Sequence, residues 1–165
     1  MSFTQPIRIK QRTTLSALAG LCALTTWSNV AMTAEESTSP ETIIETRKAG
    51  LKKMGAAMKV LGTQLKSGAP DNASMVAAAQ TISAGAQQQS RWFPVGSGPE
   101  SGIDTDALPN IWTDRAKFDA TINQLVAESK NLTTVVSGND PKTISAQVKV
   151  VGNVCGACHH SFRAD

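Results

Sequence analysis

The stretch that decides the fold is Ile144-Ser-Ala-Gln-Val-Lys-Val-Val-Gly-Asn-Val-Cys-Gly-Ala-Cys-His-His-Ser-Phe162. Its apolar residues and its two cysteines recur at alternating intervals of three and four, which places them on one face of a helix. These residues are Ile144, Val148, Val151, Cys155, Cys158 and Phe162. Asp140 and Pro141 precede them and are typical of an N-cap and a first helical position. A helix over residues 141–162 is therefore predicted, with both cysteines facing the core.

Three earlier segments have the same spacing and predict three more helices, over about residues 40–66, 71–92 and 111–136. The residues on the repeating face are Ile44, Arg47, Leu51, Met54, Met58, Leu61 and Leu65 in the first segment, Met75, Ala79, Ile82, Ala86, Gln89 and Phe93 in the second, and Ile111, Arg115, Phe118, Ile122, Leu125, Ser129, Leu132 and Val136 in the third. Breaks rich in Gly and Pro separate the segments, and Gly138 follows the third helix as a natural stop.

Four amphipathic helices of roughly 20 to 27 residues predict an all-α fold, an antiparallel four-helix bundle. Two of the connections are short, which favours antiparallel neighbours, whereas the long connection across residues 94–109 can cross one end of the bundle. No segment alternates with a period of two, so no sheet is expected.

The first 34 residues have the layout of a secretory signal peptide. Three basic residues open this segment, the mostly apolar run 15–27 follows, and small residues then provide cleavage positions after Ala31 or Ala34. The apolar run is shorter than the roughly 20 residues that span a membrane. We therefore expect an exported chain whose mature part is residues 35–165, a periplasmic protein with no membrane segment.

Cleavage would also remove the basic character of the chain. The whole sequence has 16 Lys and Arg against 13 Asp and Glu, and the leader holds three of the basic residues and none of the acidic ones. The mature part then carries 13 charges of each sign. This balance gives no reason to expect nucleic acid as a partner.

The residues Cys155-Gly-Ala-Cys158-His159 form a C-x-x-C-H motif, the signature of covalent haem attachment in c-type cytochromes. The two thiols can add to the two vinyl groups of haem, and the adjacent imidazole of His159 can ligate the iron. The sequence thus predicts one haem c per chain. His160 lies about 100° further round the helix and is expected on the surface.

Three other uses of these residues compete with haem. A thioredoxin-like dithiol needs a βαβ setting, and no strand is predicted. Cys155, Cys158, His159 and His160 could supply four zinc ligands, but they lie within six residues and do not easily surround a tetrahedral ion. A plain disulfide leaves the histidine unexplained.

The order of motifs resembles the class II cytochromes c, the cytochrome c′ family, which are four-helix bundles. The matching stretches are Arg47-Lys-Ala-Gly-Leu-Lys-Lys-Met-Gly55, Phe93-Pro-Val-Gly-Ser-Gly-Pro99, Leu108-Pro-Asn-Ile-Trp112 and Cys155-Gly-Ala-Cys-His-His-Ser-Phe-Arg163. The resemblance implies that Arg47 lies at the haem propionates. It also implies that Leu51 covers the distal haem face and that Arg163, at i+4 from His159, stands on the proximal side.

These residues lead to two hypotheses about the iron. A pentacoordinate, high-spin haem with Leu51 on its open side would carry electrons, bind small gases such as nitric oxide or carbon monoxide, or do both. A six-coordinate carrier with Met54 or Met58 as ligand is the alternative, and a thiol oxidoreductase is a third reading. We expect no enzyme activity. The redox partner is not predicted, and the resemblance leaves monomer and homodimer both open.

Overall fold

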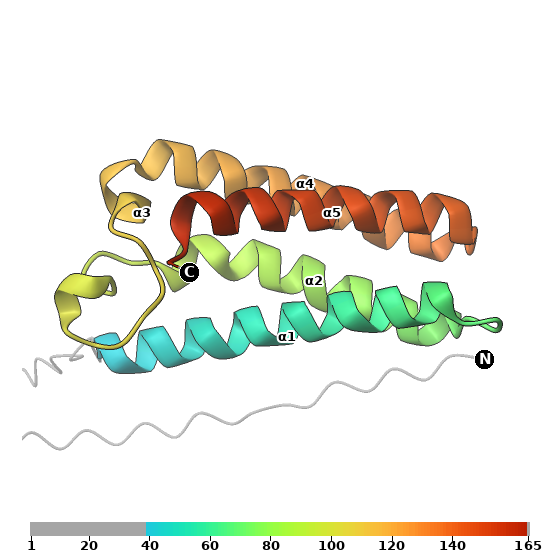
Figure 1. Ribbon diagram of the computed structural model, residues 1–165, viewed down its shortest axis with the longest axis horizontal. Helices are drawn as coiled ribbons and strands as arrows, with labels where there is room; N and C mark the ends of the chain where they lie inside the picture. The colour runs from blue at the N-terminus through green and yellow to red at the C-terminus, as the bar shows by residue number, and fades with distance from the viewer. Residues whose placement is uncertain (1–38, 165) are drawn as a thin grey trace, which may run out of the picture. The chain divides into compact units, whose positions relative to one another are not determined.

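The computed structural model describes residues 39–164, and the predicted leader lies outside this range. Four long helices form an antiparallel bundle (Figure 1): α1 (Pro40–Lys66), α2 (Asn72–Trp92), α4 (Arg115–Ser137) and α5 (Pro141–Phe162). Two short turns lie in the long connection, η1 (Pro99–Ser101) and α3 (Asn110–Thr113). The predicted all-α four-helix architecture is confirmed. None of the helices described is long and apolar enough to cross a membrane.

Local side chains fix the helix starts. Asp71 accepts hydrogen bonds from the N–H groups of Ala73 and Ser74, and Asp140 accepts from those of Lys142 and Thr143. Hydrogen bonds from the hydroxyl groups of Ser74 and Thr143, the largest cause in each case, and these backbone bonds lower the pKa of both carboxyl groups. These caps satisfy amide groups that lack partners within the helix, and they account for the observed starts of α2 and α5.

The prediction of one continuous helix over residues 111–136 is wrong at its start. The chain leaves the helical conformation at Asp114, with φ −122° and ψ 55°, so that α3 and α4 are separate. The Asp114 carboxylate accepts from the N–H of Lys117 at 3.4 Å and caps α4. A short polar side chain that bonds to the backbone competes with helix continuation, which explains the break. At the other end Gly138 caps α4 as predicted, but the left-handed residue is Asn139, with φ 54°.

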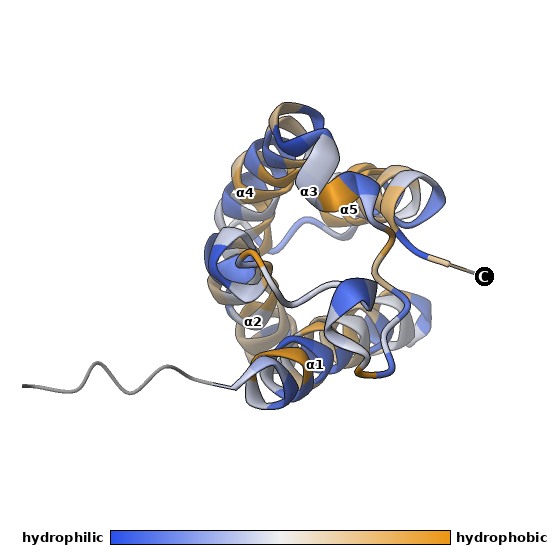
Figure 2. Ribbon diagram, turned by 90° about the vertical axis from the view of Figure 1, so that its left-hand side faces the viewer, coloured by the Kyte–Doolittle hydropathy of each residue, from blue (hydrophilic) through white to orange (hydrophobic). Residues whose placement is uncertain are grey.

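The four long helices stand at the corners of a square (Figure 2). Around it α1 packs on α2, α2 on α4, α4 on α5 and α5 on α1, so that α2 lies diagonally opposite α5. The α1–α5 side has the fewest contacts of these four pairs. The bundle is therefore least tightly closed beside the helix that carries the two cysteines.

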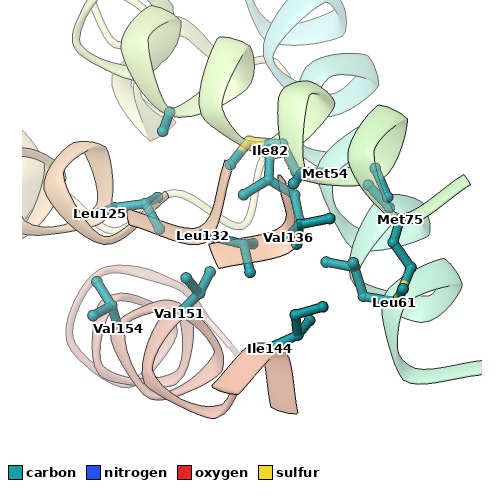
Figure 3. Packing of buried hydrophobic residues seen from close by; sticks show 14 residues of the cluster. Met54, Leu61, Met75, Ile82, Leu125, Leu132, Val136, Ile144, Val151 and Val154 are labelled. Carbon is teal, nitrogen blue, oxygen red and sulfur yellow. The ribbon is translucent and has the colours of Figure 1, made fainter. Parts of the chain in front are cut away.

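Aliphatic side chains fill the central core, as Figure 3 shows, with Leu61, Met75, Ile82, Leu132, Val136, Ile144 and Val151 among them. A second, aromatic cluster contains Phe93, Ile111, Phe118, Ile122 and Phe162. Its rings meet edge to face, with the Phe118 and Phe162 centroids 5.3 Å apart at 88°. The core of this helical bundle is therefore mainly aliphatic, with its few phenylalanines gathered in one group.

The α1–α2 packing allows no side chain at Gly50. A Cβ at this position would lie 2.3 Å from Cη2 of Trp92, a rigid ring on α2. We expect Gly50→Ala to lower the free energy of unfolding by about 1–3 kcal/mol, because overpacking outweighs the gain in helix propensity. A Cβ at Gly62 on the same helix would meet nothing within 4 Å, so the control Gly62→Ala should raise that free energy by about 0.5–1 kcal/mol. Thermal unfolding of the two variants measures both effects; equal shifts in the same direction would contradict the packing argument.

Candidate functional site

A cavity of about 590 Å³ opens beside the last two turns of α5. Its walls come from all four long helices and from the connection between α2 and α3. Apolar side chains line its interior, including Ile82, Phe118 and Leu125, whereas charged residues such as Lys48, Lys52 and Arg163 also line it. A largely apolar cavity with a few polar groups is typical of a small-molecule or cofactor site.

The structure brings the predicted attachment residues together on the wall of this cavity. Cys155, Cys158 and His159 all line it, as the three-four spacing on α5 requires. Cys155 packs against the aliphatic core and Cys158 against the aromatic cluster. The two sulfur atoms are thus held on one side of an apolar cavity, and the imidazole is next to them, which suits a flat macrocycle attached through two thioethers.

Burial makes the two thiols weak acids. It raises the pKa of Cys158 to about 11, with a smaller contribution from the neighbouring Cys155, and it raises the pKa of Cys155 as well. Both groups are therefore neutral thiols near pH 7. Cysteines that act in thiol–disulfide exchange have a lowered pKa instead, so the environment disfavours the thiol oxidoreductase reading.

His159 is exposed to solvent where it lines the open cavity. Partial burial, and to a lesser degree the positive charge of Arg163, lower its pKa and favour the neutral imidazole that can ligate a metal. His160 is exposed and does not line the cavity, in agreement with the sequence prediction.

Arg163 lines the cavity, but its predicted place on the helix is wrong. Helix α5 ends at Phe162, and Arg163 is extended, with φ −122° and ψ 137°. Its backbone forms an isolated bridge with Ala107, because the end of the chain pairs with the connection before α3. The N–H of Leu108 donates to the carbonyl of Phe162 at 3.0 Å. This pairing fixes the end of α5 against the cavity wall. The helix ends at Phe162 as predicted, and Arg163 lies just beyond it.

Arg47 is 2% exposed and also lines the cavity. Its Nη1 donates to the carbonyl and the hydroxyl of Ser97 at 3.0 and 3.2 Å, and its Nη2 donates to Thr105 Oγ1 at 2.8 Å. The guanidinium carbon lies 4.6 Å from the centroid of the Phe93 ring. Sequence reasoning missed Ser97 and Thr105, because both lie in a connection without periodicity.

The contacts of Arg47 leave a positive charge without a full counterion. Burial lowers the pKa of the guanidinium, and the charge of Glu100 opposes this shift only in part. Within residues 39–164 its hydrogen-bond partners are carbonyl and hydroxyl oxygens, with no carboxylate among them. A guanidinium has five N–H groups and pairs best with a carboxylate, so an anionic group in the cavity would complete this site.

The α1 side chains beyond Arg47 differ in how they lie relative to the cavity and to α2. Leu51 lines the cavity and is 36% exposed, and Met58 also lines it. Met54 reaches the cavity but is 6% exposed, and its sulfur atom packs on α2. A Cβ at Gly85 would lie 2.5 Å from that sulfur, and Gln89 Nε2 donates to it at 3.6 Å. The sequence placed Gln89 on the buried face of α2 without assigning it a role.

Comparisons with known proteins agree with this site. The sequence model of the family described as cytochrome c′ matches residues 42–163. A cytochrome c′ of Rhodopseudomonas palustris is 34% identical over 153 residues, which cover 91% of this chain and 95% of that protein. A cytochrome c-556 of Agrobacterium fabrum is 33% identical over 125 residues, covering 73% and 80%. Among solved structures, a cytochrome c′ with an unusual ligand-controlled dimer dissociation is similar with a TM-score of 0.72, at 26% identity over 78% of this chain and 98% of that one.

Loss of the Arg47 guanidinium should loosen the long connection. We expect Arg47→Met to lower the free energy of unfolding of the haem-bearing protein by about 1–3 kcal/mol, because buried acceptors lose their donor. Lys53→Met, an exposed change on the same helix, should shift it by less than about 0.5 kcal/mol. Denaturant unfolding of the two variants tests this expectation, and an Arg47→Met protein as stable as the control would contradict it.

Proposed function

We propose that this chain, which belongs to the cytochrome c′ family, is a periplasmic cytochrome whose haem iron keeps one coordination position free for small gases. The chain carries haem c, attached through a C-x-x-C-H motif that contains Cys155 and Cys158. The bound haem supplies a one-electron redox centre and an iron atom that accepts axial ligands. The proposal concerns what the protein does with that centre: it carries an electron or holds a gas, and it catalyses no reaction.

Different residues around the cavity would bind different parts of the haem. Cys155 and Cys158 fix the macrocycle against α5, and the neutral imidazole of His159 provides the proximal iron ligand. The incomplete ion pairing of Arg47 supports its assignment to the propionates, since a carboxylate there would neutralise a buried cation. Arg163 lines the same cavity and adds positive charge beside His159.

The observation that carries the proposal is the position of the Met54 sulfur. A thioether is the side chain on this face of α1 best able to compete for the sixth iron position. The Met54 sulfur packs instead against Gly85 and Gln89 on α2, and this supports Leu51, three residues earlier, as the side chain over the distal face. An aliphatic side chain donates no lone pair, so the position stays free of protein ligands.

The alternative is a six-coordinate, low-spin electron carrier. The residue that favours it is Met58, which lines the cavity without being fully buried. Met58 lies seven positions beyond Leu51, about two helical turns or roughly 11 Å along α1. If Leu51 is centred over the iron, that separation places Met58 out of reach, and the pentacoordinate proposal is preferred.

Substitution of Leu51 tests the open position. We expect Leu51→Ala to bind carbon monoxide faster and more tightly than the unchanged protein, because an aliphatic obstacle is removed. Leu51→Met should shift the absorption spectrum toward a low-spin, six-coordinate form. Val60→Ala, which shortens another exposed apolar side chain on α1, should change neither property. A ferrous protein that is already low-spin and fails to bind nitric oxide would overturn the proposal in favour of the six-coordinate carrier.

We further propose export to the periplasm and assembly as a homodimer through α1 and α2. The outward residues of α2 support such an interface, since no charged side chain occurs between Asp71 and Arg91. Ala77, Ala84 and Gln88 are exposed there. A related cytochrome c′ undergoes ligand-controlled dimer dissociation.

Protein purified from a periplasmic extract tests both points. Mass spectrometry should give a chain that begins within a few residues of Glu35, and sedimentation should give twice the mass of that chain. Ala77→Glu should reduce the sedimenting mass to that of one chain, because two like charges would face each other across the interface. An intact Met1, or a single-chain mass for the unchanged protein, would contradict the corresponding point.

A further inference from the structure

Gln89 is a buried amide on the wall of the haem cavity. Its side chain is 4% exposed, and it lies on α2 between the apolar residues Ala86 and Phe93 of the same face. Within the part of the chain that the structure describes, its one side-chain hydrogen bond runs from Nε2 to the sulfur of Met54 at 3.6 Å. The deep wall around it is apolar and includes Ile82 and Leu125.

This hydrogen bond satisfies the amide poorly. A thioether sulfur is a weak acceptor, and burial of an amide without a good partner is unfavourable. Buried polar groups in folded proteins nearly always have partners, so a nearly unpaired donor that lines a cavity indicates an acceptor that belongs in the cavity. Arg47 differs, because carbonyl and hydroxyl oxygens already accept from it.

The position of Gln89 places it on the distal side. Helix α2 lies diagonally opposite α5, the helix that carries His159 (Figure 2). Gln89 therefore approaches the cavity from the side away from the proximal ligand. Its contact with Met54, three residues after Leu51, connects it to the α1 segment assigned to the distal face.

We propose that Gln89 is the hydrogen-bond donor of the distal cavity and that it favours diatomic ligands whose outer atoms become negatively charged. This inference rests on the proposed open iron position. Nitric oxide gains electron density from ferrous iron and accepts a hydrogen bond, whereas bound carbon monoxide accepts one only weakly. The Nε2–H group turns from the sulfur of Met54 to the ligand, while the Met54 sulfur stays packed against Gly85. A distal donor of this kind is one of the features that decide which gas a haem protein retains.

Removal of the hydrogen-bond donor should affect the binding of nitric oxide and of carbon monoxide differently. We expect Gln89→Leu and Gln89→Met, which keep the size of the side chain, to weaken nitric oxide binding to the ferrous haem protein by about two- to tenfold, the range of one neutral hydrogen bond. Carbon monoxide binding should change by less than twofold. The N–O stretching frequency should rise, because a hydrogen bond to the ligand weakens the N–O bond. Gln124→Leu, an exposed change on α4 outside the proposed α1–α2 interface, should change none of these quantities.

The outcomes distinguish this inference from the function on which it rests. An unchanged protein that binds neither gas would overturn the open iron position. A protein that binds both gases, with the same nitric oxide affinity and N–O frequency in Gln89→Leu as in Gln124→Leu, would overturn the role of Gln89 alone. Equal weakening of nitric oxide and carbon monoxide in both Gln89 variants would also overturn it, because that result indicates a change in cavity shape.

Discussion

The buried guanidinium of Arg47 is the interaction on which the closed end of the bundle depends. It comes from the second turn of α1 and bonds to the carbonyl at the end of α2 and to two residues of the long connection. One charged side chain of α1 therefore holds the end of α2 and the connection that follows it, 45 to 58 positions further along the chain. Such a cation is costly to bury unless its hydrogen bonds and its charge are satisfied, and the protein supplies the bonds but only part of the charge. In the proposed haem-bound state, a propionate at Arg47 would supply the rest of that charge and would link the closure of this end to the cofactor.

The second constraint is the space beside α5. The same connection that surrounds Arg47 also pairs with the last residues of the chain, so the end of α5 is fixed at the cavity that its cysteines line. Two glycines leave room for larger side chains of the neighbouring helices. Gly85 gives the Met54 sulfur room on α2, and Gly50 gives the Trp92 ring room on α1. Gly85 therefore lets the Met54 sulfur lie against α2 at the cavity, and Gly50 lets α1 and α2 pack closely at Trp92.

Electrostatics gives the cavity wall two distinct sides. On the α5 side the imidazole is neutral and the thiols are protonated, which suits metal ligation and thioether formation more than redox exchange. On the diagonally opposite α2 side, the lining side chains are the apolar Ile82 and the amide of Gln89. This division is consistent with the proposal that the cavity holds one haem and discriminates between small uncharged gases.

Much of this arrangement follows from the sequence alone. The three-four spacing assigned the buried faces of the long helices. Asp140 and Pro141 marked the start of α5, and Cys155 to His159 identified the cofactor. Each of these signals is local in sequence. Tertiary structure decided the rest. Arg47 finds its acceptors 50 and 58 positions away, and Gln89 meets Met54 across 35 positions. These contacts depend on the path of the long connection and on the rotation of α2 against α1. Neither can be recognised from the periodicity of the sequence. The extended Arg163 has the same origin, since pairing with the connection overrode helix continuation there. The break at Asp114 is local instead, because the Asp114 side chain caps α4.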